Sequence, residues 1–210
     1  MAGPYDLEEQ ERIDAIKDWW GVNGKYVYAA IATFILALAG WRGWQYWTQS
    51  QAEDAAKMYA EVTKSRADPK KFVEAADQLV ARHPRSFYAS QAQLVLAKDA
   101  FERNDLASAR TRLEWVVDRG AQAHRGIASV RLGAVLLDDK KYAEALKVLD
   151  ANTDEAFAPM VADLKGDVFY AQGRIDEARA QYKAAVEKAG ARGPLKSVSQ
   201  IKLDALGGSK

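Results

Sequence analysis

The sequence predicts an all-α protein in which a single N-terminal transmembrane helix is followed by a solenoid of helical repeats. Three observations support this fold class. The stretch 26–47 is apolar and carries a single charge, Arg42. After residue 50 the apolar side chains recur at helical spacing, with almost no alternating pattern of the strand type. Within that region, similar segments recur about every 34 residues, the period of a helix-turn-helix repeat.

The apolar stretch is long enough to cross a membrane. At about 1.5 Å of rise per residue, a helix over 26–47 reaches roughly 33 Å, close to the thickness of a hydrocarbon core. Aromatic rings, which favour the headgroup layer, occur at both of its ends. We therefore expect membrane-interface positions at Tyr26, Tyr28, Trp41, Trp44 and Trp47.

A buried core helix and a cleaved signal peptide are the alternatives to a membrane span here. A core helix could be equally apolar, but aromatic residues at both ends serve no purpose there. A signal peptide would fit the small residues Ala37-Leu38-Ala39. However, the preceding segment is long and acidic, and the apolar run continues past Ala39 without a polar break. An uncleaved signal anchor is therefore favoured over both.

The span divides the chain into a tail over 1–24, a transmembrane helix over 25–47 and a soluble region over 48–210. Basic residues are nearly balanced on its two sides, so the charge bias does not decide the topology. The whole chain has a net charge of +1 and no cysteine. Because the soluble region is not strongly basic, nucleic acid is not expected as a partner.

The soluble region contains an internal repeat. The segments ERNDLASAR, DDKKYAEAL and AQGRIDEAR superpose, and the offsets between them are 36 and 33 residues. The same offsets align three sets of positions: Ala97, Gly133 and Gly166; Asn104, Lys140 and Gly173; Leu113, Leu149 and Tyr182. A weaker fourth copy is DPKKFVEAADQLVARHP, with Phe72, Ala75 and Leu79 in the equivalent places.

The period and the small/large pattern resemble the tetratricopeptide repeat. Each unit is expected to be two antiparallel helices whose small residues allow close approach, and stacked units bury a continuous core. An ordinary helical bundle is the alternative. The last segment, PLKSVSQIKLDAL, predicts a capping helix. Its inner apolar face is expected to hold Leu195, Val198, Ile201 and Leu206.

The first helices of the units are expected to line a partner-binding groove. Counting from the aligned small residues gives ten candidates: Gln91, Leu94, Lys98, Phe101, Val130, Ala134, Leu137, Asp163, Asp167 and Tyr170. This set is apolar and weakly charged, and Lys98 is its one basic member, so it predicts a groove for an extended or helical polypeptide. Phe101, Leu137 and Tyr170 are the expected anchors. Packing against a neighbouring helix is the alternative role for these residues.

No catalytic constellation is recognisable in the sequence. The two histidines, His83 and His124, have no cysteine nearby, and no HExxH, GxSxG, GxGxxG or Walker A pattern occurs. The acidic residues fall at spacings typical of solvated helix surfaces. We therefore expect neither an enzyme nor a bound cofactor or metal.

The architecture as a whole resembles the YfgM family. The similarity is carried by DLEEQERIDAIKDWWGVNGKYV at the start, by Gly40-Trp41-Arg42 with Trp44-Gln45-Tyr46-Trp47, and by the closing KSVSQIKLDAL. The resemblance implies a bacterial inner-membrane protein with a cytoplasmic N-terminus and a periplasmic C-terminal domain. It also implies an ancillary role at the SecYEG translocon, beside membrane lipid, with a PpiD-like prolyl-isomerase-type chaperone and newly exported nascent proteins as partners.

Two further functions are compatible with the sequence. A membrane-anchored scaffold for envelope assembly would use the same anchor and groove. A regulator would instead act through the cytoplasmic tail over 1–24. Copurification with the translocon distinguishes the scaffold from a translocon subunit. Deletion of the tail tests the regulator.

Overall fold

The computed structural model describes residues 5–190 and 193–207, with side chains from residue 9 onward. It divides into two compact units, residues 1–52 and 53–210. Residues 1–4 of the expected tail, and residues 191–192 and 208–210 of the expected soluble region, lie outside the described residues. Within the described ranges the secondary structure is helical, without strands.

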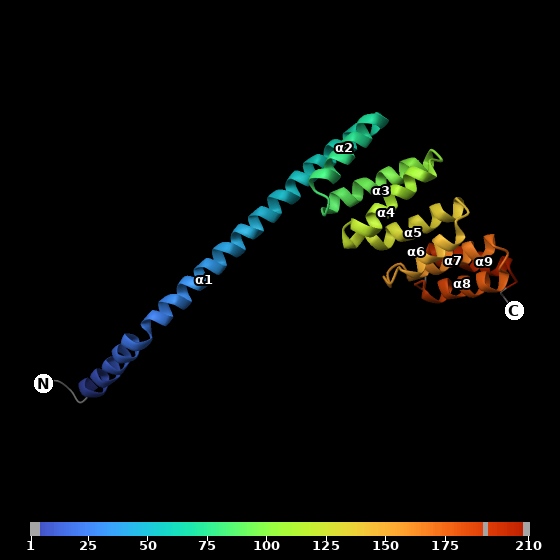
Figure 1. Ribbon diagram of the computed structural model, residues 1–210. Coiled ribbons are helices and arrows are strands. Elements are labelled where there is room, and N and C mark those ends of the chain that lie inside the picture. The colour runs from blue at the N-terminus through green and yellow to red at the C-terminus, as the bar shows by residue number, and fades with distance from the viewer. Residues whose placement is uncertain (1–4, 191–192, 208–210) are drawn as a thin grey trace. The chain divides into compact units, whose positions relative to one another are not determined.

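The first helix, α1 (Tyr5–Lys64), contains the predicted span (Figure 1). By length and composition it is the one helix in the described part of the chain that could cross a membrane. Its apolar side chains are exposed, for example Phe34 at 67% and Leu36 at 72%. The hydroxyl group of Thr33 donates to the carbonyl of Ala29, so this polar side chain is satisfied within the helix. Only 6% of its most apolar window is buried within the described structure, whereas the core helix of a soluble protein is mostly buried, so a core helix is disfavoured.

Eight further α-helices and one 3-10 turn follow in the described residues. In chain order they are η1 (Ser65–Ala67), α2 (Pro69–Arg82), α3 (Phe87–Glu102), α4 (Leu106–Arg119), α5 (Gln122–Asp138), α6 (Tyr142–Asp150), α7 (Ala158–Ala171), α8 (Ile175–Lys188) and α9 (Pro194–Ala205). Several begin at sequence signals for helix starts. The side chains of Asp68, Ser86 and Asp105 accept hydrogen bonds from backbone amides in the first turns of α2, α3 and α4.

The helices of the second unit form stacked hairpins. The pairs are α3 with α4, α5 with α6 and α7 with α8, and α3, α5, α7 and α9 also contact one another in a row (Figure 1). The last turns of α1 complete the first pair with α2, since Ala55 and Val62 share a buried cluster with Phe72 and Leu79. This arrangement confirms the predicted all-α, tetratricopeptide-like solenoid.

The turns within the hairpins confirm the predicted repeat. Asn104, Lys140 and Gly173, which the sequence alignment places at one position, all adopt a left-handed backbone, with φ of 60°, 59° and 75°. A backbone NH after each turn residue donates to a carbonyl in the last turn of the preceding helix, such as Asp105 to Ala100 at 2.8 Å. The chain therefore reverses in the same way in three successive units.

The small residues allow close helix contact, as the pattern predicted. A Cβ added at Gly133 would lie 2.8 Å from the Leu149 side chain, and one at Gly166 would lie 2.4 Å from the Tyr182 ring. Both contacts join the first helix of a pair to the second, at the positions that the 33-residue offset relates. Glycine is needed here for close approach.

The fourth, weaker copy is in a different register from the predicted one. Both α2 and α4 are 14 residues long, and they follow the capping residues Asp68 and Asp105. Aligning the helix starts pairs Phe72 with Ala109 and Leu79 with Val116, which shifts the copy by three residues. Accordingly Ala76, rather than the expected Ala75, is fully buried. The error arose because Phe72 and Leu79 fit buried positions in both registers. The buried residues Phe72, Ala76 and Leu79 follow the spacing i, i+4, i+7.

The predicted inner face of the capping helix is wrong for two of its four residues. In α9 the buried residues are Ser199 and Leu203, whereas Val198 is 46% and Ile201 is 69% exposed. The helix is rotated because polar groups on α7 attract Ser199 and Lys202 inward. Charge pairing therefore decides which face of α9 packs against the solenoid.

Candidate polypeptide-binding groove

Two adjoining cavities lie between α3 and α5. The first has a volume of about 280 Å³ and a mainly apolar lining. Its lining residues are Ala97, Lys98, Phe101, Leu113, Arg131, Ala134 and Val135. We call it the apolar cavity.

The second cavity has a volume of about 350 Å³ and a more polar lining. Its lining residues are Arg66, Gln91, Leu94, Val95, Lys98, His124, Ile127 and Arg131. We call it the charged cavity. Because Lys98 and Arg131 line both cavities, the two form one surface, the α3–α5 groove.

The α3–α5 groove is positively charged. Arg66, Lys98 and Arg131 contribute to its lining, and no aspartate or glutamate is among its lining residues. The Nζ atom of Lys98 lies 3.4 Å from Oε1 of Glu102 on the same helix. Both side chains are more than half exposed, so this pair holds Lys98 only weakly. The groove therefore presents three cations beside an apolar surface.

His124 adds a buried polar group to the charged cavity. It is the third residue of α5, it is 8% exposed, and its ring lies 4.3 Å from the ring of Phe87. Within the described residues, its Nδ1 atom is buried without a hydrogen-bond partner. Burial, and then the charge of Arg131, lower the pKa of His124 below its ordinary value. The imidazole is therefore neutral at pH 7, and one of its nitrogens is unsatisfied.

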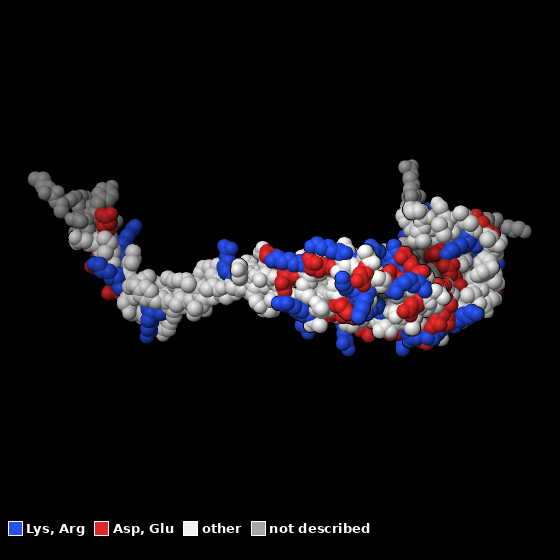
Figure 2. Space-filling view, turned by 90° about the horizontal axis from the view of Figure 1, so that it is seen from above, with Lys and Arg blue, Asp and Glu red and all other residues white. Residues whose placement is uncertain are grey.

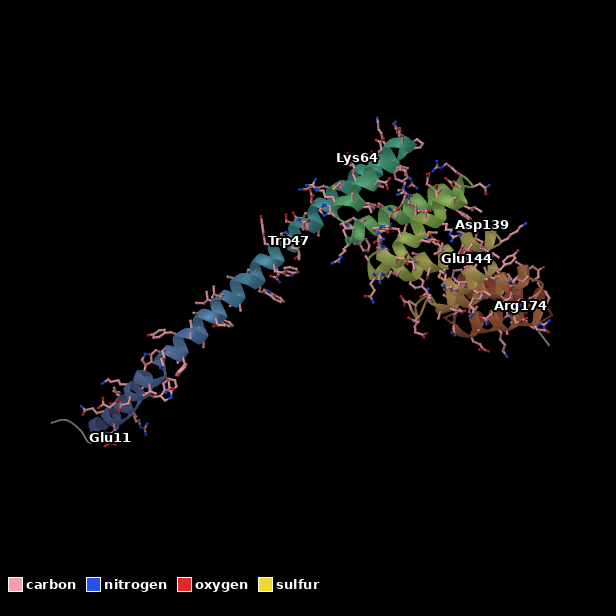
Figure 3. All side chains as sticks on the ribbon, in the orientation of Figure 1. Glu11, Trp47, Lys64, Asp139, Glu144 and Arg174 are labelled. Atoms are coloured by element: carbon pink, nitrogen blue, oxygen red, sulfur yellow. The ribbon has the colours of Figure 1, made fainter. Side chains whose placement is uncertain are left out.

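A larger cavity, of about 960 Å³, lies between α4, α5, α6 and the segment 151–154. It lies beside the short helix α6, which has nine residues, whereas α4 and α8 have 14. Its lining contains both acidic and basic residues. Two of its acidic lining residues, Glu114 and Glu144, form ion pairs with Arg110. Glu144 is labelled in Figure 3. This cavity therefore lacks the single-sign charge of the α3–α5 groove.

The structure brings together five of the ten predicted groove residues. Those that line the α3–α5 groove are Gln91, Leu94, Lys98, Phe101 and Ala134. Leu94 is nevertheless 4% exposed and belongs mainly to the core. Of the three expected anchors, Phe101 is therefore the one in the groove.

Three other predicted residues lie outside both cavities. Val130 is 7% exposed and belongs to the core cluster of α3 to α7, and Leu137 packs against the same cluster. For these two the helix-packing role holds. Tyr170, near the end of α7, is 55% exposed.

The remaining two predicted residues, Asp163 and Asp167, are covered by α9. Oδ1 of Asp163 accepts a hydrogen bond from Ser199 at 2.7 Å, and Lys202 donates to both carboxylates. Tyr182 also donates to Asp167, at 2.8 Å. Burial lowers the pKa of Lys202, but the hydrogen bonds to the two carboxylates outweigh this effect and raise it above its ordinary value. The helix α9 therefore occupies the place next to α7.

Arg66, Arg131 and His124 are groove residues that the sequence did not predict. Arg66 lies in η1, between α1 and α2, so no repeat position relates it to α3 or α5. The positions equivalent to Arg131 in the neighbouring repeats are Val95 and Leu164, which are apolar. Two basic residues therefore converge on Lys98 without a signal in the repeat pattern.

The five expected membrane-interface residues all lie on α1. Tyr26, Tyr28, Trp41 and Trp44 are each more than 60% exposed, and Trp47 is 54% exposed. The rings of Trp44 and Trp47 lie 5.5 Å apart, and Trp47 is labelled in Figure 3. Figure 2 shows the span as a nearly uncharged white stretch, whereas basic and acidic side chains mix over the visible face of the second unit.

No metal site is evident in the part of the chain that the structure describes. No group of three or more histidine, aspartate or glutamate side chains is arranged there to hold an ion. His83 contacts Asp54 at 2.9 Å, which ties the end of α2 to α1. The hydrogen bond from His83 is the main reason why the pKa of Asp54 is lowered. This pair therefore has a structural role.

Comparison with known proteins supports the fold and the full-length resemblance. A family model described as a tetratricopeptide repeat-like domain matches residues 17–208. The solved structure of a MamA RS-1 ArsTM double mutant matches 75% of this chain and 89% of its own, with a TM-score of 0.52. Since only 17% of the aligned residues are identical, this similarity concerns the fold alone.

Three bacterial relatives share the name ancillary SecYEG translocon subunit. The protein of Neisseria gonorrhoeae is 32% identical over 95% of this chain and 98% of its own. That of Haemophilus influenzae is 32% identical over 80% of this chain and 84% of its own. The protein of Escherichia coli is 27% identical over 94% of this chain and 96% of its own. The chain therefore belongs to the YfgM family of tetratricopeptide repeat-like proteins.

Proposed function

We propose that this protein is a non-enzymatic, single-pass inner-membrane subunit associated with the SecYEG translocon. The observation that carries the proposal is its 32% identity, over 95% of its length, to a protein named ancillary SecYEG translocon subunit. The aligned part of this chain includes both the apolar span and the repeats, which supports a shared role.

The repeat domain is proposed to bind polypeptide through the α3–α5 groove, on the periplasmic side of the membrane. The bound chains are newly exported proteins, or a segment of a PpiD-like prolyl-isomerase-type chaperone. The exposed ring of Phe101 beside an apolar cavity supports this role, since peptide grooves use such anchors.

The anchor supports the same function. In this proposal α1 spans the lipid over 25–47, with the tail over 1–24 in the cytoplasm and residues 48–210 in the periplasm. A groove tethered beside the channel meets an emerging chain at a high effective concentration, so weak binding is sufficient. Weak binding also allows release when the exported protein folds.

Copurification of the tagged full-length chain from detergent-solubilised membranes tests the translocon association. We expect SecY, SecE and SecG at levels well above those recovered with a control, in which residues 1–52 are replaced by an unrelated single-span anchor. Recovery of a different envelope complex without these subunits would favour the scaffold function.

The role of the tail is tested separately. Removal of residues 2–24 should leave part of the activity of a periplasmic binding protein, provided that the span still inserts. Complete loss of activity in a correctly inserted protein would favour a regulator that acts through its cytoplasmic tail.

A further inference from the structure

We propose that the α3–α5 groove selects polypeptide segments in which acidic side chains lie about three residues from an apolar side chain. This inference rests on the proposed function, because it names the class of segment that the polypeptide-binding groove accepts. It identifies the ligand by its chemistry, which is a pair of side-chain carboxylates followed or preceded by an aliphatic residue.

The positive charge of the groove favours an anionic partner. Three cations line the charged cavity and two of them also line the apolar cavity, whereas no carboxylate lines either one. Of the three cations Lys98 is paired, with Glu102, whereas Arg66 and Arg131 form no salt bridge among the described residues. Arginine can bind a carboxylate with two parallel hydrogen bonds, which are stronger than hydrogen bonds between neutral groups. An acidic segment would therefore neutralise charges that the protein itself leaves uncompensated.

The unsatisfied atom of His124 is a second and independent observation. Its ring lines the charged cavity and is more than nine-tenths buried, yet Nδ1 has no partner within the described part of the chain. Buried polar atoms in folded proteins almost always have a hydrogen-bond partner. The charged cavity is therefore lined by a residue with an unused hydrogen-bonding group, beside the three cations.

The adjoining cavity accounts for the apolar residue of the segment. It is lined by Ala97, Phe101, Leu113, Ala134 and Val135, in addition to the two shared cations. Phe101 is 40% exposed, so part of its ring is free to cover a ligand side chain. An aliphatic side chain placed there would gain stabilisation by leaving water.

The helix rise sets the spacing between the two parts of the ligand. Leu94 lines the charged cavity and Phe101 lines the apolar cavity, two turns further along α3. At about 1.5 Å per residue this separation is roughly 10 Å. An extended chain covers about 3.3 Å per residue, so about three residues are enough to span the groove from the far end of the charged cavity to Phe101.

Fluorescence anisotropy with the full-length protein in nanodiscs tests the proposal. The probe is a labelled, C-terminally amidated peptide of glycine and serine that contains two adjacent glutamates and, three positions later, a leucine. A second probe has the leucine three positions before the two glutamates, so that both directions of binding along the groove are tested. We expect at least one probe to bind, and its glutamate-to-glutamine form to bind about tenfold or more weakly.

Variants of the protein identify the site. Lys98→Gln and Arg131→Gln should each weaken binding of the acidic probe about tenfold, while binding of the glutamine probe changes little. Lys183→Gln is the matched control, because Lys183 is an exposed cation on α8 with a side chain that is 70% exposed. Circular dichroism spectra and Tm values of all three variants establish that they are folded.

Equal binding of the acidic and glutamine probes, or no binding of either acidic probe at millimolar concentration, would overturn the inference. Selective binding of a glutamine peptide with a free C-terminus would overturn it as well, because the ligand would then be a terminal carboxylate. None of these outcomes affects the proposed function, because other experiments test it. Copurification measures the association with the translocon, and cross-linking from Phe101 measures the capture of polypeptides.

Discussion

The Nζ atom of Lys202 lies 2.7 Å from Oδ1 of Asp167, so the last helix of the chain is tied to α7 by an ion pair. The same ammonium group lies 2.8 Å from Asp163, whose side chain is 13% exposed. Together with Ser199, these residues form a polar network at the end of the solenoid. The network explains why α9 turns its apolar residues Val198 and Ile201 toward solvent.

Replacing Lys202 with methionine should destabilise the end of the solenoid. The two carboxylates would lose their cation while Asp163 stays buried. This loss costs about 3–5 kcal/mol for a fully buried pair, and less here because the Lys202 side chain is 29% exposed. We expect a lower free energy of unfolding in urea, and faster hydrogen exchange in α9 and α8 than in α3. Lys183→Met serves as control, and equal exchange in the two variants would contradict the role of the network.

Replacing Gly166 with alanine should also destabilise the protein. The new Cβ would lie 2.4 Å from the Tyr182 ring, and the hydroxyl group of that ring is held by Asp167. We expect a loss of about 1–3 kcal/mol from overpacking, despite the better helix propensity of alanine. At Gly190 an added Cβ meets no atom of the described residues within 4 Å, so Gly190→Ala should have little effect on Tm.

The left-handed turn residues make a paired prediction. Gly173 and Lys140 occupy the same position in successive repeats, with φ of 75° and 59°. Gly173→Ala should therefore lower the free energy of unfolding by about 1 kcal/mol, and Lys140→Gly should raise it by up to about 1 kcal/mol. Urea denaturation of both variants checks this, and changes of the same sign would speak against a shared turn geometry.

The buried His124 should make stability depend on pH. Its pKa is below the ordinary value of 6.5 in the folded state, so the unfolded chain binds the proton more readily. The contribution of His124 is therefore fully present above about pH 6.5 and is lost as the pH falls toward the lower folded-state pKa. Between about pH 7.5 and 5.0 the wild type should lose more stability than His124→Gln. Equal losses in parallel urea titrations would show that His124 does not cause the effect.

Periodicity was sufficient to predict the solenoid and its turns. The positions of Gly133, Gly166, Lys140 and Gly173 follow from spacing, because each repeat imposes the same packing and the same chain reversal. The register of α2 was not predicted, since Phe72 and Leu79 suit the core in two alignments. Its capping residue Asp68 was the signal that distinguishes them.

The candidate site was predicted only in part. Repeat spacing placed Lys98, Phe101 and Ala134 together, because it identifies the face that the first helices share. Repeat spacing did not predict that α9 covers Asp163 and Asp167. The ion pairs of Lys202 with these two carboxylates stabilise this orientation of α9, even though it leaves the side chain of Ile201 exposed. The convergence of Arg66 with Arg131 depends on a turn outside the repeat pattern, so it required the three-dimensional structure.

Capture of exported chains by the α3–α5 groove can be measured by in-cell photo-cross-linking from a benzoyl-phenylalanine at Phe101 of the full-length, membrane-anchored protein. The same probe at Lys183, exposed on α8, is the control. We expect the Phe101 probe to cross-link to exported nascent chains, a Sec subunit or a periplasmic prolyl isomerase, and the control to remain without these products. Equal cross-linking from both positions, or cross-links from Phe101 to an unrelated envelope complex alone, would contradict a polypeptide-binding groove at the translocon.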